Sequence, residues 1–199
     1  MGPSMTEIVD PEKDLALEWA WLELDTDQSI RYHRKRAIFH RTMKNINAFI
    51  IIFIGGATFS GTLTSLFDMK SAAVSSMLGL SLALTGAIDY IVGFGEQAKY
   101  HAMKRAAYAE IFKKITTSTF SEKLYHELKI QYMDVHAEED GRLRIVDLQA
   151  RNEVIVSRDL PRDEMVRISL IRRLAAPFAR FEYYIPQKIL HAEAAKPTV

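Results

Sequence analysis

The chain has 199 residues, with 26 Lys and Arg residues against 25 Asp and Glu residues and a formal net charge of +1. This balance provides no global attraction to nucleic acid, so we expect no nucleic-acid partner. The sequence contains no cysteine, which excludes a disulfide framework, a thiol nucleophile and a thiolate metal site. The length fits one domain, or a membrane hairpin with a modest cytosolic part.

Charge is segregated near the N-terminus. Residues 6–27 are acidic and are predicted to form a separate helical segment, whereas residues 31–44 are basic. Asp27 or Ser29 is suited to cap the next helix. We expect that helix to run through the basic residues directly into the apolar stretch that follows, because its apolar positions have helical spacing.

Two uncharged apolar runs then follow each other, over residues 46–67 and 71–88, with only residues 68–70 between them. At 1.5 Å per residue the first run reaches roughly 33 Å as a helix, enough to cross the ~30 Å hydrocarbon core of a bilayer. The second run is equally long if it continues to Phe94. Because the connection is so short, we predict an antiparallel hairpin with transmembrane spans over about 46–67 and 71–94.

Basic residues flank both outer ends of the predicted hairpin, whereas its tip carries only Lys70 beside Asp68. The flanking residues are Arg34, Lys35, Arg36, Arg41 and Lys44 before the hairpin and Lys99, Lys104 and Arg105 after it. By the positive-inside rule, both termini are expected in the cytoplasm.

Small residues recur at four-residue spacing in both spans. They are Gly56, Ser60 and Thr64 in the first span and Ser75, Gly79, Ala83 and Ala87 in the second. Small side chains let helix backbones approach closely in lipid. Such a face can join the two helices of one hairpin or assemble several copies. A single contact between two helices needs less small-residue surface than the two spans provide, so we expect a homo-oligomer.

Asp89 is the only acidic residue inside the predicted spans and lies roughly 7 Å from the cytoplasmic end of the second span. Thr85 lies one turn earlier. An intramembrane carboxylate must face water, protein or a cation, so both residues are candidates for lining a pore. Alternatively, Asp89 reaches hydrated headgroups or pairs with Lys44. Asn45 and Asn47 are placed to hydrogen-bond across to it.

Beyond the second span, Gly93 and Gly95 indicate a hinge, and apolar residues at spacings of three and four predict a stalk helix. The hairpin with its stalks is therefore expected over residues 28–117. Ser121 is suited to cap a helix over about 122–138, and a further helix is predicted over 143–156. Pro161 fits the first turn of a last helix over 162–184 that Pro186 ends.

These elements predict an all-α membrane protein, in which long cytoplasmic stalk helices extend a two-helix transmembrane hairpin. Residues 118–192 are expected to form a cytoplasmic helical region that can dock a protein partner, and residues 193–199 a tail.

Chemical signals are weak. Potential metal ligands gather at one helix end, namely His136, Glu138, Glu139 and Asp140, but clustered acids at this position are more typical of a solvated terminus. Three histidines of the stalks, His33, His40 and His101, are expected at the level of the lipid headgroups. We expect no enzyme, and no catalytic, metal or cofactor-binding residue.

Three segments resemble the SLATT group of bacterial two-span membrane proteins, and together they cover about residues 29–160. The first is residues 29–40 followed by an apolar run with Gly55, Gly56 and Ala57. The second span with residues 98–102 and Tyr108 follows, and then an Asn-Glu motif within residues 148–153. The resemblance implies an inner-membrane effector of a bacterial conflict or antiphage defence system that assembles and permeabilises the membrane. It carries over no catalytic residues.

Two further interpretations stay open. The chain can be a membrane anchor or scaffold without a pore, whose cytoplasmic helices dock a protein. Alternatively, the two apolar runs form the core of a soluble helical assembly, although uncharged runs of this length are typical of membranes.

Overall fold

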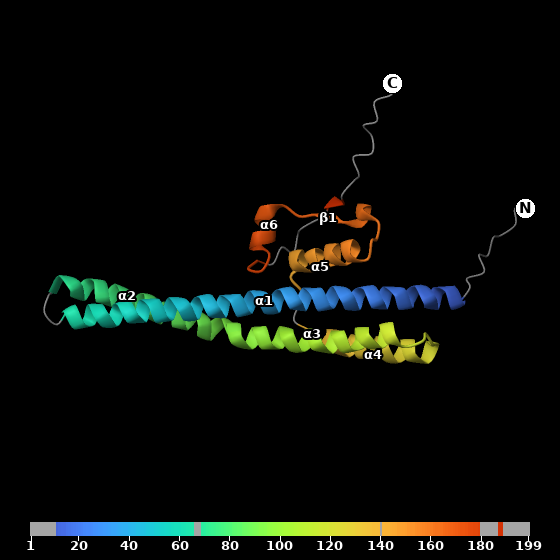
Figure 1. The fold of residues 1–199 in the computed structure, drawn as a ribbon, viewed down its shortest axis with the longest axis horizontal. Coiled ribbons are helices and arrows are strands. Elements are labelled where there is room, and N and C mark those ends of the chain that lie inside the picture. The colour runs from blue at the N-terminus through green and yellow to red at the C-terminus, as the bar shows by residue number, and fades with distance from the viewer. Residues whose placement is uncertain (1–10, 66–68, 140, 180–186, 189–199) are drawn as a thin grey trace, which may run out of the picture. The chain divides into compact units, whose positions relative to one another are not determined.

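A computed structural model describes residues 11–65, 69–139, 141–179 and 187–188 (Figure 1). Within these ranges the side chains of residues 11–13, 57–73, 75 and 187–188 are not described. The described chain is mostly helical, as predicted. Its long helices are α1 (Pro11–Ser65), α2 (Met69–Val92) and α3 (Phe94–Thr117), followed by α4 (Glu122–Ala137) and α5 (Arg144–Ser157). The 3₁₀ helix η1 (Arg162–Glu164), β1 (Val166–Arg167), α6 (Leu170–Ala175) and β2 (Gln187–Lys188) complete the described elements. The two short strands pair antiparallel, with Val166 opposite Lys188.

The chain divides into two compact units. Residues 35–102 form one, which we call the hairpin unit, and residues 1–34 with 103–199 form the other, the bundle unit. The acidic N-terminal segment and the predicted C-terminal region thus contribute to the same unit.

α1 is already helical at Pro11, so the predicted start of a new helix at Asp27 or Ser29 is wrong. Neither residue caps a helix. The Ser29 hydroxyl donates to the carbonyl of Asp25 at 2.8 Å, within the same helix, and Asp27 accepts from Arg31 at 2.8 Å. Hydroxyls that bond back to the preceding turn are compatible with a helix interior. Burial of Leu22 in the core of the bundle unit favours the uninterrupted helix.

The core of the bundle unit lies between α1, α3 and α4. Its buried members are Leu22, Tyr108, Ile111, Ile115, Tyr125 and Leu128. Trp19 closes one end of this core by packing edge-to-face on Phe120, with ring centroids 5.3 Å apart. A second apolar cluster joins Tyr32 of α1 to Ile145, Val146 and Ala150 of α5 and Ala176, just beyond α6. These two apolar clusters therefore hold α1, α3 and α5 in place around the polar residues that lie between these helices.

The hairpin unit contains the second part of α1, α2 and the first turns of α3. Its two arms run antiparallel, since His40 packs on His101 and Lys44 lies against Gly95. Gly93 separates α2 from α3 with φ at +61°, a conformation that favours glycine. This break confirms the helix interruption predicted there. The connection between α1 and α2 lies outside the described residues.

α4 and α5 confirm the helices predicted over about 122–138 and 143–156. Ser121 caps α4 by accepting from the amide of Leu124. The continuous helix predicted over 162–184 is wrong in its described part, because η1, β1 and α6 replace it. Asn152 of α5 explains the change: its side chain accepts from the amide of Val166 at 2.9 Å and donates to the carbonyl of Val166 at 2.8 Å. Pro186 lies outside the described residues.

Candidate functional site

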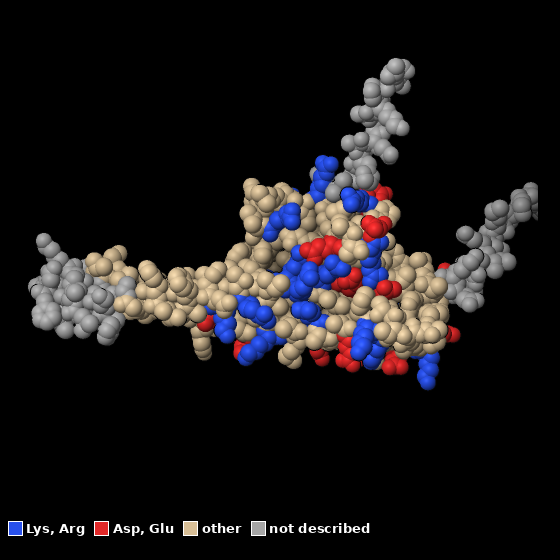
Figure 2. All heavy atoms as spheres, in the orientation of Figure 1, with Lys and Arg blue, Asp and Glu red and all other residues tan. Residues whose placement is uncertain are grey.

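The hairpin unit exposes large apolar side chains on both arms. Phe49, Ile52 and Phe53 of α1 are 69–74% exposed, and Met77 and Ile91 of α2 are 73% and 80% exposed. Figure 2 shows most of α2 without charged side chains on the visible face. Among the described residues, two helices are long and apolar enough to cross a membrane. An apolar surface of this extent needs lipid or protein to cover it.

Asp89 and Thr85, the predicted intramembrane polar pair, are both half-buried in α2. The Thr85 hydroxyl donates to the carbonyl of Ser81 at 2.8 Å, which satisfies it within the helix. Asp89 forms no ion pair with Lys44 among the described residues, and the Lys44 ammonium lies beside Gly95 instead. The suggested hydrogen bond from Asn47 is also absent there, since Asn47 Nδ2 has no partner.

The predicted packing glycines do not bring the arms of the hairpin together. A Cβ atom built on Gly56 or on Gly79 would meet no atom within 4 Å. Ala83 and Ala87 are exposed. The side chains of Ser60, Thr64 and Ser75 lie outside the described set. At Gly56 and Gly79, the small-residue faces are therefore not in close contact with any other part of the chain that the structure describes.

The predicted flanking basic residues have different environments. Arg34 pairs with Glu153 at 3.3 Å, and Lys99 pairs with Glu96 at 2.8 Å. The guanidinium of Arg36 lies 5.7 Å from the ring of Phe39. The others divide by exposure into exposed Arg41, Lys44 and Arg105, half-buried Lys35 and buried Lys104.

Lys104 is the buried member of this group and contacts α4. Its side chain is 9% exposed, and its Nζ donates to Glu138 at 2.7 Å and to the carbonyl of Val135 at 2.9 Å. Both acceptors lie at the end of α4. Lys104 thus ties α3 to α4 inside the bundle unit.

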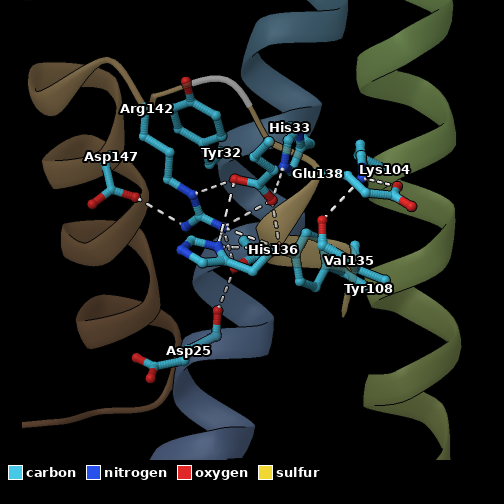
Figure 3. A network of polar contacts seen from close by, with 12 residues as sticks. Asp25, Tyr32, His33, Lys104, Tyr108, Val135, His136, Glu138, Arg142 and Asp147 are labelled. Carbon is cyan, nitrogen blue, oxygen red and sulfur yellow. Dashed lines mark hydrogen bonds and ion pairs between the residues drawn. The ribbon is translucent and has the colours of Figure 1, made fainter. Parts of the chain in front are cut away.

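The most extensive polar site of the described chain centres on Glu139, directly after α4 (Figure 3). His33 of α1, Tyr108 of α3 and Arg142 all donate to its carboxylate, and we call these four residues the Glu139 cluster. His33 Nε2 lies 2.9 Å from Oε1, and Arg142 Nε lies 2.7 Å from Oε2. Tyr108 donates its hydroxyl to Oε1. The Glu139 side chain is only 4% exposed.

Arg142 extends the cluster to further elements. Its Nη2 donates to Ser29 of α1 at 2.9 Å and to Nδ1 of His136 at 3.3 Å, while Nη1 lies 3.4 Å from Asp147 of α5. Figure 3 shows Asp147 on the opposite side of the guanidinium from His33. The guanidinium also lies 5.3 Å from the ring of Tyr32. One side chain therefore connects α1, α4 and α5.

The charges of the cluster are set by its contacts. Burial raises the pKa of Glu139, but the hydrogen bonds from His33, Arg142 and Tyr108 outweigh burial and hold that pKa well below its usual range. Burial lowers the pKa of His33, against the opposing effect of Glu139. An ionised carboxylate only accepts hydrogen bonds, so the proton of neutral His33 lies on Nε2. Burial and the Glu139 carboxylate raise the pKa of Tyr108.

This arrangement is suited to holding helices together rather than to catalysis. The carboxylate of Glu139 is occupied by three donors, and His33, at 1% exposed, is stacked on Tyr108 with ring centroids 5.6 Å apart. Neither group has a free position for a substrate. The described residues also contain no group of three metal-ligating side chains that could hold an ion.

One sequence interpretation is corrected here. Glu139 belongs to a buried cluster instead of a solvated helix terminus, while His33 is buried in the bundle unit. The only sequence signal was the four-residue spacing of Ser29 and His33, which places them on one helical face but is too common to identify a site. His33 and Glu139 lie more than a hundred positions apart in the sequence.

No family model, curated protein or solved structure matches this chain.

Proposed function

We propose that this chain is a bacterial inner-membrane protein that assembles with copies of itself into a pore or another membrane-disrupting structure, with both termini in the cytoplasm. The observation that carries the proposal is the apolar surface of the hairpin unit, where Ile52, Met77 and Ile91 are 73–80% exposed. Lipid covers such a surface without a soluble partner. Two antiparallel arms of suitable length and composition meet the requirement that spanning segments be helical.

Assembly is supported by the small-residue faces. Since no atom of the described residues lies within 4 Å of a Cβ built on Gly56 or Gly79, a neighbouring helix can approach there. Close helix approach at small residues is a main source of association in lipid. Asp89 has no ion-pair partner among the described residues, which favours a water-facing role in the assembled protein.

The resemblance of residues 29–160 to the SLATT group supports a role as an effector in bacterial conflict or antiphage defence. The bundle unit then supplies a rigid cytoplasmic part, stabilised by the Glu139 cluster. No side chain of that cluster has the free geometry needed for catalysis, so we assign it no enzymatic role.

The test is expression in bacterial cells with a dye that reports membrane potential. We expect depolarisation by the wild-type chain and a changed conductance in Asp89→Asn. Intact potential in cells that hold abundant, membrane-inserted protein would contradict the pore. An oligomer mass measured in detergent provides a second readout, since a pore needs several copies.

Gly79→Leu tests the assembly face, with Ser81→Leu as its matched control. The two positions are two residues apart and therefore point to different sides of α2. There is room for the new side chain at Gly79 in the single chain, so a smaller oligomer and loss of depolarisation in this variant alone would support the proposed contact. Equal behaviour of both variants would oppose it.

The alternative is a membrane anchor or scaffold that docks a cytoplasmic protein. It is favoured by α6, where Leu170, Ile171 and Leu174 are 69–80% exposed. This alternative predicts that Ile171→Glu releases one stoichiometric partner while membrane potential is unaffected by either form. Val156→Glu on α5, where Val156 is 51% exposed, is the control.

A further inference from the structure

One side of α1 in the hairpin unit carries a line of polar residues that faces α3. Positions separated by four, four and three residues share a helix face. Together with two residues of α3 they form what we call the polar seam: Arg36, His40, Lys44 and Asn47 of α1 and Gly95 and His101 of α3. The rings of His40 and His101 lie 5.6 Å apart and nearly parallel, at 13°. A Cβ built on Gly95 would lie 3.5 Å from the Lys44 ammonium.

His40 and Asn47 of the polar seam bury polar atoms that have no hydrogen-bond partner in the described chain. His40 is 5% exposed, and both of its ring nitrogens lack a partner; Asn47 is 8% exposed, and its Nδ2 lacks one. The ring of His40, a residue expected at a headgroup level, is enclosed between the arms of the hairpin and stacks on His101. Native proteins satisfy nearly all buried polar atoms. These atoms therefore point to a partner from outside the chain.

The charges of the seam indicate the chemistry of that partner. Burial and the nearby Arg36 charge lower the pKa of His40 to about 4, so at neutral pH the ring is neutral and offers one N–H donor. Asn47 Nδ2 is also a donor, and Lys44 adds a positive charge. No acidic side chain bonds to these three residues in the described chain, and Glu96 is paired with Lys99. The unpaired donors of His40 and Asn47 beside the Lys44 charge suit an anion and disfavour a metal ion.

We infer that the polar seam binds a phosphate group, with Lys44 supplying charge and His40 an N–H donor. His40 and Asn47 are about 10 Å apart along the helix axis, which exceeds the reach of a single phosphate. A phospholipid is longer: with its phosphate at His40 and Lys44, an ester oxygen can accept from Asn47. This lipid orientation rests on the proposed membrane insertion, because Asn47 lies at the start of the span predicted from residue 46. The phosphate site itself does not depend on pore formation.

The test uses the purified full-length protein in detergent and follows its thermal unfolding midpoint at constant pH and ionic strength. Three additions are compared: inorganic phosphate, phosphatidylglycerol and diacylglycerol, which lacks phosphate. Stabilisation by the first two and not the third supports a general phosphate site. Stabilisation by phosphatidylglycerol alone assigns the site to a lipid headgroup. Equal effects of the two lipids, or no effect of any addition, would overturn the inference.

Variants locate the effect. His40→Phe keeps an aromatic ring but removes both nitrogens, and it should weaken phosphate binding roughly tenfold, the loss expected for a hydrogen bond to a charged group. Its control is His126→Phe, at a histidine whose side chain is 61% exposed in the bundle unit. Lys44→Met should weaken binding similarly, with exposed Arg41→Met as control. This second pair decides the question if His40→Phe does not fold.

Asn47→Leu separates the two sources of phosphate, with exposed Asn45→Leu as control. It should weaken binding of phosphatidylglycerol and leave inorganic phosphate unaffected. Wild-type affinity for every phosphate compound in His40→Phe and Lys44→Met would overturn the site. Because binding is measured in detergent, such a failure is distinct from a failure to depolarise cells.

Discussion

The Nε atom of Arg142 donates to Oε2 of Glu139 at 2.7 Å, and the two side chains are 17% and 4% exposed. This contact joins the end of α4 to the approach to α5. It also places the guanidinium where it reaches Ser29 of α1 and Asp147 of α5. The stability of the bundle unit should therefore depend on this pair more than on the ion pairs at its surface.

Glu139→Gln should destabilise the bundle unit by about 3 kcal/mol, because removing one partner of a buried pair leaves the other charge uncompensated. Thermal unfolding followed by circular dichroism in detergent measures the effect. Glu122→Gln is the control at the other end of α4, since the Glu122 side chain is 76% exposed and its loss should cost less than about 1 kcal/mol. Equal losses in the two variants would contradict a special role of Glu139.

Acidification should destabilise the bundle unit. The folded-state pKa of Glu139 is lowered, so its contribution is complete above its unfolded pKa of about 4.3 and is lost as the pH falls below that value. The pKa of His33 is also lowered, so its protonation opposes folding below about pH 6.5. Both groups act in the same direction, and unfolding midpoints measured from pH 7 to about pH 2 should decrease, with the Glu139 contribution lost below about pH 4.3. Glu139→Gln should flatten the lower part of this curve, whereas an unchanged slope would remove Glu139 as its cause.

Tyr108→Phe should cost about 1–2 kcal/mol, because it removes one of the three donors to Glu139 and keeps the ring that stacks on His33. The unfolding midpoint provides the measurement. Tyr90→Phe is the control, since Tyr90 is 91% exposed. A midpoint of Tyr108→Phe equal to that of the wild type would show that its hydroxyl adds nothing to the cluster.

Asn152→Leu should release the segment around β1. Its side chain makes two hydrogen bonds with the backbone of Val166, and losing them should cost about 1–3 kcal/mol. Hydrogen exchange should show faster exchange of the Val166 amide. The Leu143 amide, which donates to the Tyr32 hydroxyl at 3.0 Å, serves as an internal control and should keep its protection. Faster exchange at both amides would indicate general unfolding instead.

Local sequence determined much of the helical framework, because its signals lie within a few residues of one another. Ser121 caps α4 as expected from its position before a helical pattern. Gly93 interrupts the helix because glycine tolerates the positive φ found at this position. The apolar runs predicted two helices long enough to span a bilayer, since length and hydrophobicity are additive properties of a segment.

Tertiary structure alone decided the sites. Glu139 resembles any acid at a helix end until Arg142, His33 and Tyr108 are brought to it, and His33 lies more than a hundred residues away along the chain. Likewise, Asn152 holds Val166 extended, which overrides the predicted last helix. Burial and hydrogen bonding depend on which helix faces pack together, and no short stretch of sequence encodes that pairing. The sequence by itself therefore determined where helices form and which are apolar, whereas packing determined which polar groups are buried and what they bind.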